Sequence, residues 1–404
     1  MGQTNGNSRD AVILSGARTP IGRFMGVLSP VAATDLGAVA VRGAMERSGV
    51  DPEAVEEVIM GNVIQAGEGQ APARQAALHG GLPSSVGAVA VNKVCGSGLK
   101  AVMLASSAIR AGDGDVFVAG GFESMSQAPF LVKGIREGHK YGNMELLDAN
   151  QVDGLYCTVE CWMMGDAAEF IGEEFEVSRQ AMDEFALASH QKAVAAQDAG
   201  RFKKEIVPVE VTGRKGTTTV DADEAPRRDT SADALMKLPG AFKQGGAVTA
   251  GNAPSLNDGA AALVVTSREY AESNGHAPLA RVIAYGHAAV DPKWIFSAPA
   301  KAMPKVLQKA GWSLEDVDLI EVNEAFAAQV LANGRDMEQQ GFKWPSEKVN
   351  VNGGAIALGH PLGASGARVL VTLIHALQDR GGKRGLAALC LGGGEAVAMA
   401  VEME

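Results

Sequence analysis

The sequence predicts an α/β protein in which two related halves form a layered core and a third segment folds over it. Strand-like apolar runs alternate with helix-like segments through residues 11–124, and the alternation returns from residue 261 onward. Residues 125–246 carry more charge and more chain-breaking residues. The second alternating stretch also repeats local sequence from the first. These features indicate a duplicated core with an inserted lid.

The first half is predicted to alternate between short buried strands and helices. Gly49 follows a stretch of helical spacing and is a usual C-terminal signal, and Asp51 and Pro52 then begin a short helical turn. We expect strands at residues 11–15, 58–61, 86–91 and 116–124, and helices at residues 35–48, 70–78 and 99–110.

The segment after residue 125 contains one strong amphipathic helix over residues 178–196, for which Ser178 is a suitable N-cap. The core pattern resumes with strands at residues 261–266 and 281–285. We therefore expect a first core half (residues 1–124 with 247–275), a lid (125–246) and a second core half (276–404).

The second half echoes the first in four ordered places. Residues 44–55 and 58–59 correspond to 307–317 and 319–320, residues 96–102 correspond to 364–370, and the apolar strand 116–121 corresponds to 386–394. Chance similarity between generic βαβ units is the alternative. A true duplication predicts two halves packed face to face, with the loops at their strand ends meeting in one crevice.

Composition excludes several classes of partner. The chain has 404 residues and a net charge of −11, which argues against nucleic-acid and anionic-membrane binding. We find no run of roughly 18 apolar residues and no apolar leader in the polar first ten residues. Four cysteines are too few for a disulfide framework, and free thiols fit a reducing, cytoplasmic setting. Cys157 and Cys161 lack the further ligands of a metal site.

Cys95 lies where an apolar strand passes into a helix. Unpaired backbone N–H groups and the positive end of the helix dipole should favour its thiolate form. Gly96 and Gly98 leave room for a bulky thioester to approach the backbone. The alternative is a buried cysteine in a tight turn.

Three C-terminal motifs accompany Cys95. They are Asn-Glu-Ala-Phe-Ala at residues 323–327, a glycine-rich run at residues 352–366 that contains His360, and Cys-Leu-Gly-Gly-Gly at residues 390–394. Together with residues 91–101, 121–126 and 250–261, they resemble the thiolase family in the family's own order, from about Ala11 to the end of the chain. The resemblance implies the thiolase fold, with αβαβα layers.

The resemblance also implies a reversible Claisen condensation of coenzyme A (CoA) thioesters, most simply of two acetyl-CoA molecules to acetoacetyl-CoA. The residue types fit this chemistry. A thiolate is both a nucleophile and a leaving group, which suits Cys95. His360 can take the proton of the Cys95 thiol. Cys390, as a second thiol, can remove the α-proton of the second acetyl group.

Two oxyanion sites are needed, because both steps place negative charge on a carbonyl oxygen. By resemblance, the backbone N–H groups of Cys95 and Gly392 form one, and His360 with a water held by Asn323 forms the other.

Each of these residues has a structural alternative. His360 could be a turn histidine, Cys390 a core thiol at a strand end, and Asn323 the N-cap of a helix. Residues 353–366 could be a nucleotide loop, but they lack the Lys-Ser/Thr pair of a phosphate loop.

CoA is expected as substrate and product, with no tightly bound cofactor and no metal. Arg227 and Arg228 are candidates for its phosphates, although a solvated basic pair is as consistent with the sequence. By resemblance, Met164 lies beside the pantetheine or acyl chain and Ser255 belongs to the loop on the adenosine side. Glu123 is expected to have a structural role. Family members are homodimers or homotetramers.

Two departures from the family pattern leave the acyl chain open. Met163 stands where acetoacetyl-forming members usually have histidine, and Pro254-Ser255 replaces a frequent Ser-Gly. A degradative 3-ketoacyl-CoA thiolase of fatty acid metabolism is therefore the main alternative. A decarboxylating ketoacyl synthase is disfavoured because the third group is Cys390, and a non-catalytic acyl-CoA or sterol carrier is disfavoured by the intact Cys95, His360 and Cys390.

Overall fold

The computed structural model describes residues 7–214 and 216–404. The polar residues 1–6 lie outside the described part of the chain. Within it, ten strands form one sheet in the order β14-β15-β16-β13-β1-β12-β5-β3-β4, and β2 pairs with β12. Their bounds are β1 Ala11–Arg18, β2 Gly22–Arg23, β3 Glu57–Gly61, β4 Gly87–Val91, β5 Val116–Ser124, β12 Asn257–Ser267, β13 Ala280–Ala289, β14 Leu319–Val322, β15 Arg384–Leu391 and β16 Glu395–Met403.

The sheet repeats itself about its middle. From the middle of the sheet outward, the order β1-β12-β5-β3 in the first half corresponds to β13-β16-β15-β14 in the second. The pairs β5–β3 and β15–β14 are parallel, and the other pairs in these two series are antiparallel. The predicted duplication is confirmed. The halves also join edge to edge, where Val12 pairs with Arg281 and Ile13 with Ala280. This short bridge between β1 and β13 was not predicted.

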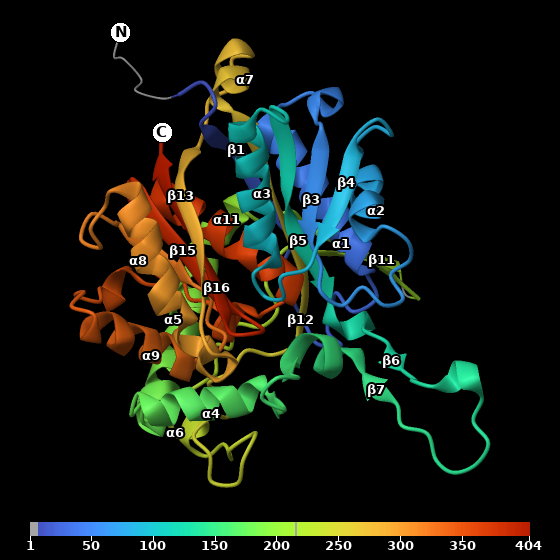
Figure 1. Cartoon of the computed structure of the whole chain (residues 1–404), viewed down its shortest axis with the longest axis vertical. Coiled ribbons are helices and arrows are strands. Elements are labelled where there is room, and N and C mark those ends of the chain that lie inside the picture. Colours follow the sequence, from blue (N-terminus) through green and yellow to red (C-terminus); the bar gives the residue numbers. More distant parts are fainter. Residues whose placement is uncertain (1–6, 215) are drawn as a thin grey trace.

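Helices form three layers around the two halves of the sheet (Figure 1). Helices α3 (Ser97–Ala111) and α11 (Leu362–Arg380) lie between the halves and pack in the largest apolar cluster. Helices α1 (Ala33–Ser48) and α2 (Pro72–His79) cover the outer face of the first half, and α8 (Ala298–Ala310) covers that of the second, with α9 (Ala327–Gln339) beside it. The layering is the predicted αβαβα order.

The two central helices touch near their N-terminal ends because glycines face each other there. A Cβ on Gly98 would lie 2.6 Å from the backbone nitrogen of Ala367, and one on Gly366 would lie 2.3 Å from that of Leu99. Only glycine permits such an approach of two backbones. Cys95 and His360 each come two residues before one of these helices, so this contact brings their loops together.

The segment between the halves folds over one end of the core. Its helices are α4 (Met164–Glu174), α5 (Arg179–Asp198) and α6 (Ala232–Met236), and its strands form the short pairs β6 (Phe130–Leu131) with β7 (Leu147–Asp148), β8 (Tyr156–Cys157) with β9 (Trp162–Met163), and β10 (Val209–Gly213) with β11 (Gly216–Val220). The Ser178 side chain accepts the Ala181 N–H at 3.2 Å, so the predicted N-cap of α5 is confirmed. The hairpins were not predicted.

The remaining α-helices in the described ranges are short, α7 (Arg268–Ser273) and α10 (Ala355–Leu358). The Gly49 C-cap of α1 is left-handed, with φ 66°, and the turn after Asp51 is the short helix η1 (Pro52–Ala54), both as predicted. No helix in the described ranges combines the length and apolar character that crossing a bilayer requires.

Candidate active site

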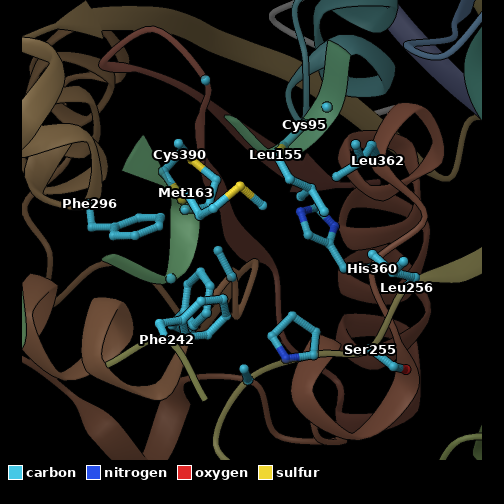
Figure 2. Close-up of a pocket in the computed structure, with 18 of the residues that line it drawn as sticks. Cys95, Leu155, Met163, Phe242, Ser255, Leu256, Phe296, His360, Leu362 and Cys390 are labelled. Atoms are coloured by element: carbon cyan, nitrogen blue, oxygen red, sulfur yellow. The ribbon is translucent and has the colours of Figure 1, made fainter. Parts of the chain in front are cut away.

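A cavity of about 330 Å³ lies where the loops of both halves meet the inserted segment. Cys95, His360 and Cys390 all line it, as Figure 2 shows. Most of the remaining wall is apolar, including Leu155, Met163, Met164, Phe242, Leu256, Phe296 and Leu362. A dry wall of this kind strengthens electrostatic interactions at the three polar groups.

Cys95 follows β4 and precedes α3, as the sequence predicts. Val94 before it has φ 46°, a strained value for a β-branched residue, and it turns the chain sharply at this point. The sulfur faces two backbone N–H groups, its own and that of Gly392, both of which favour the thiolate. Gly392 lies in the turn between β15 and β16.

The prediction that Cys95 favours its thiolate form is wrong for the enzyme without substrate. Burial and the charge of Glu123 outweigh the two N–H groups and raise the pKa of Cys95 to about 12. The resting side chain is therefore a neutral thiol that must lose its proton during reaction. The two N–H groups remain available for a negatively charged oxygen formed beside the sulfur.

His360 is held by hydrogen bonds that define its tautomer. Its Nδ1 lies 2.6 Å from Ser365 Oγ, and that hydroxyl donates to the Pro361 carbonyl at 2.8 Å. Because the hydroxyl proton is used there, Nδ1 carries the ring proton and donates it to Oγ. Nε2 is then the acceptor.

Local backbone geometry fixes the direction of the His360 loop. Gly359 has φ 113° and packs against the Asn257 side chain, where a Cβ would lie 2.4 Å away. Asn257 Oδ1 also accepts the His360 N–H at 2.9 Å. Burial, with the charge of Arg368, lowers the pKa of His360 to about 3, so the imidazole is neutral at physiological pH and can act as a base.

Asn323 follows β14 and is fully buried. Its Nδ2 lies 3.4 Å from His360 Nε2, whereas its Oδ1 has no hydrogen-bond partner among residues 7–214 and 216–404. A buried amide oxygen of this kind is suited to hold a water molecule. Helix α9 begins only at Ala327, with Phe326 as its N-cap, so the alternative that Asn323 caps a helix is wrong.

Cys390 lies near the end of β15, with 2% of its surface exposed. Burial raises its pKa well above the usual thiol value, and the nearby charge of Cys95 raises it further. Cys390 and Cys95 line the same cavity. One sulfur comes from each half of the duplicated core.

Glu123 supports the site without lining the cavity. Its carboxylate accepts the backbone N–H groups of Val63, Ile64 and Gly363 at distances from 2.8 to 3.1 Å, and the amide of Asn62 at 3.2 Å. It thereby joins the ends of β3 and β5 to the start of α11. The expected structural role is confirmed.

The residues predicted to contact CoA divide into two groups. Met164 and Ser255 line the cavity, as does Met163. Arg228 instead forms an exposed ion pair with Asp198, at 2.7 Å, and does not line the cavity. The backbone N–H of Arg227 donates to His190 Nδ1 at 3.2 Å. Arg228 as a CoA ligand stays a prediction.

Ser365 and Asn257 were missed as parts of the site. Both belong to motifs that the sequence resemblance already covered, and the serine five residues after His360 was the available signal. All four cysteines are free; Cys157 is buried and Cys161 is exposed. In the described part of the chain, no group of three His, Cys, Asp or Glu side chains could hold a metal ion.

Two models of known protein families together match almost the whole chain. The family described as thiolase, N-terminal domain, matches residues 11–269, and thiolase, C-terminal domain, matches residues 276–403. The chain belongs to the thiolase family. It is therefore an acyltransferase, and the thiolase fold expected from its motifs is confirmed.

Individual thiolases are similar over their full length. The chain is 52% identical over 394 residues to an acetyl-CoA acetyltransferase of Cupriavidus necator, covering 97% of this chain and 99% of that protein. It is 51% identical to one of Pseudomonas aeruginosa, covering 97% and 98%. The crystal structure of the Bacillus anthracis acetyl-CoA acetyltransferase superimposes with a TM-score of 0.95 at 43% identity, covering 98% and 99%.

Proposed function

We propose that this thiolase condenses two acetyl-CoA molecules to acetoacetyl-CoA and CoA, and catalyses the reverse thiolysis. The observation that carries the proposal is the convergence of Cys95, His360 and Cys390 on one apolar cavity, with two N–H groups facing the Cys95 sulfur. The similar proteins named acetyl-CoA acetyltransferase support the choice of acetyl groups.

In the first step, His360 Nε2 takes the Cys95 proton while the sulfur attacks the thioester carbonyl. The N–H groups of Cys95 and Gly392 stabilise the oxyanion. The carbon–sulfur bond to CoA then breaks, and the departing CoA sulfur takes a proton from Cys390. The products are an acetylated Cys95, an imidazolium at His360 and a thiolate at Cys390.

In the second step, the Cys390 thiolate removes the α-proton of a second acetyl-CoA. The enolate oxygen is stabilised by the Nε2–H of the protonated His360 and by a water held at Asn323. The α-carbon attacks the acetyl group on Cys95, the Cys95 sulfur leaves, and it recovers its proton from His360. Each group ends in its starting state.

This cycle requires the Nε2 of His360 to be the unprotonated nitrogen at the start, which assigns a positioning role to Ser365. Ser365→Ala removes the Oγ that holds the Nδ1 proton, and we expect kcat to fall about tenfold to a hundredfold, the usual value of a hydrogen bond to a charged group. Ser365→Thr retains a hydroxyl and should restore part of the loss.

The pH profile distinguishes positioning from general destabilisation. In the alanine variant the acidic limb of the pH profile of kcat should shift, because the variant lacks the hydrogen bond from Nδ1–H to Ser365 Oγ, which stabilises the protonated form of His360. An unchanged profile, with equal losses in the alanine and threonine variants, would rule out the positioning role.

The acyl chain can be tested with 3-ketoacyl-CoA thioesters of increasing length. Acetoacetyl-CoA should give the highest kcat/KM in thiolysis, and kcat/KM should fall as methylenes are added. Met163 lines the acyl region of the cavity and is apolar, which is the observation that favours the degradative alternative. Equal or rising kcat/KM toward long chains would establish that alternative and contradict the acetyl assignment.

We further propose that the enzyme is a cytoplasmic homodimer or homotetramer. Two surfaces support self-association. Strand β4 is a sheet edge, and its Val89 is 40% exposed. The arm that carries β6 and β7 projects from the body (Figure 1) and exposes several large apolar side chains, Phe130, Ile135, Tyr141, Met144 and Leu146. The four free thiols support a reducing compartment.

We propose that the chain has three parts, a first core half (residues 1–124 with 247–275), a lid (125–246) and a second core half (276–404). The support for the lid is that residues 125–246 supply Leu155, Met163, Met164 and Phe242 to the cavity wall. Met164 is proposed to lie beside the pantetheine or acyl chain, and Ser255, at the end of the cavity away from the sulfurs (Figure 2), on the adenosine side of CoA.

A further inference from the structure

Glu324 is a buried carboxylate that lies outside the cavity, directly after Asn323. It is 1% exposed and does not line the cavity. Its Oε1 accepts the Asn350 amide at 2.8 Å, and its Oε2 accepts the Ser189 hydroxyl at 2.7 Å and the Ile356 N–H at 3.1 Å. The proposed mechanism does not use this carboxylate, although burying a charge is costly even when hydrogen bonds compensate it.

The Asn350 side chain holds the backbone on both sides of Asn323. Its Oδ1 accepts the Val322 N–H at 2.9 Å, and its Nδ2 donates to the Val322 carbonyl at 2.9 Å and to Glu324. These bonds fix the orientation of the amide, so its Nδ2 can only donate to the carboxylate. The residues before and after Asn323 are therefore tied to one side chain, while the Asn323 amide lies 3.4 Å from His360 Nε2.

The other oxygen of Glu324 holds the segment that leads to His360. Oε2 accepts the N–H of Ile356, which lies in α10, four residues before the histidine. A Cβ on Gly354 would lie 2.3 Å from the carboxyl carbon, so only glycine permits this close approach. The loop that carries Asn323 and the loop that carries His360 thus meet at one carboxylate.

Ser189 extends this hydrogen-bond network to the lid. It belongs to α5 and is 3% exposed. Its hydroxyl donates to Glu324 and accepts the Gly354 N–H at 3.1 Å. One side chain of the lid therefore contacts both the carboxylate and the segment that leads to His360. The position of α5 is thereby tied to both loops.

We propose that Glu324 is a positioning residue that sets the separation of Asn323 and His360 and so holds the oxyanion site for the enolate. The proposal rests on the proposed function, in which the His360 Nε2–H and a water at Asn323 stabilise the enolate oxygen. The first half-reaction uses the N–H groups of Cys95 and Gly392 instead, and the hydrogen bonds of Glu324 go to other residues. Glu324 therefore serves the second half-reaction and not the first.

The test compares the two half-reactions in the Glu324→Gln variant. Asn350 Nδ2 and the Ile356 N–H can only donate, and each faces a different oxygen of the carboxylate. A glutamine has one acceptor oxygen, so its NH2 group must face one of these donors and displace that donor's loop. We expect condensation to acetoacetyl-CoA to slow about tenfold to a hundredfold. Exchange of labelled CoA into acetyl-CoA needs only the first half-reaction and should stay within about twofold of wild type, because His360 keeps its own hydrogen bonds.

The ratio of condensation to exchange separates positioning from destabilisation, because a loss of folded enzyme lowers both rates equally. Glu338→Gln changes an exposed carboxylate on α9; it is the matched control and should keep the wild-type ratio. In an Asn323→Ala background, Glu324→Gln should slow condensation no further, because both changes act on the same oxyanion site.

Ser189→Ala is the milder companion variant and keeps the test decisive if Glu324→Gln yields little folded enzyme. It removes only the lid's hydrogen bond to the carboxylate, and it should slow condensation about threefold to tenfold with exchange unchanged. A wild-type ratio in both variants, or a further loss in the Asn323→Ala background, would overturn the positioning role. If the wild-type enzyme formed no acetoacetyl-CoA, the proposed function itself would fail, and that result is distinct from a failure of the positioning role.

Discussion

Replacing Cys95 with alanine should lower the rate of acetoacetyl-CoA thiolysis by about 10⁴-fold or more, because in the proposed mechanism Cys95 is the nucleophile that carries the acyl chain to CoA. The loss should appear in kcat and in kcat/KM alike, since the covalent step is needed for every turnover. The assay follows acetoacetyl-CoA consumption with CoA as the second substrate.

Cys161→Ala provides the matched control for the Cys95 variant. Cys161 is an exposed free thiol that does not line the cavity, so its loss should leave the rate within about twofold of wild type. Retention of substantial activity in Cys95→Ala would mean that the acyl group passes to the CoA thiol without forming a thioester at Cys95.

Cys390→Ala should separate the two half-reactions. Acetylation of Cys95 by acetyl-CoA should still occur, because a CoA thiolate is a good leaving group that needs little help from an acid. Condensation should fall on the order of 10³-fold, since the proposed mechanism assigns removal of the α-proton to Cys390. Intact-mass measurement reports the first step, and acetoacetyl-CoA formation reports the second.

Cys390→Ser is the informative companion variant. The serine hydroxyl is similar in size to the thiol but far less acidic. The variant should therefore become acetylated at Cys95, and its condensation rate should be as low as that of the alanine variant. Normal condensation in either variant would show that a different group removes the α-proton.

The sequence was most informative where local interactions decide the structure. The N-cap at Ser178, the left-handed Gly49 and the position of Cys95 between strand and helix each depend on a few neighbouring residues. The duplication was also readable, because matched segments appear in one order along the chain. The edge contact between β1 and β13 was not, since it involves two residues from each of two strands far apart in sequence.

The site was predictable in its residues but not in its electrostatics. The pKa of Cys95 is raised by burial and by the charge of Glu123, and these effects outweigh the backbone N–H groups of Cys95 and Gly392. Arg227 and Arg228 are adjacent in sequence and both exposed, and Arg228 pairs with Asp198, a contact 30 residues away in the chain that the sequence did not indicate.

In the proposed mechanism, Cys95 carries the acyl group and Cys390 accepts and returns the α-proton. Brief incubation of the enzyme with acetyl-CoA, an acid quench and peptide mapping by mass spectrometry locate the acyl group. We expect one acetyl group on the peptide that contains Cys95, none on the peptide that contains Cys390, and loss of the label when CoA is added before the quench. Stable acetylation of Cys390, or no covalent label under conditions of turnover, would contradict the claim.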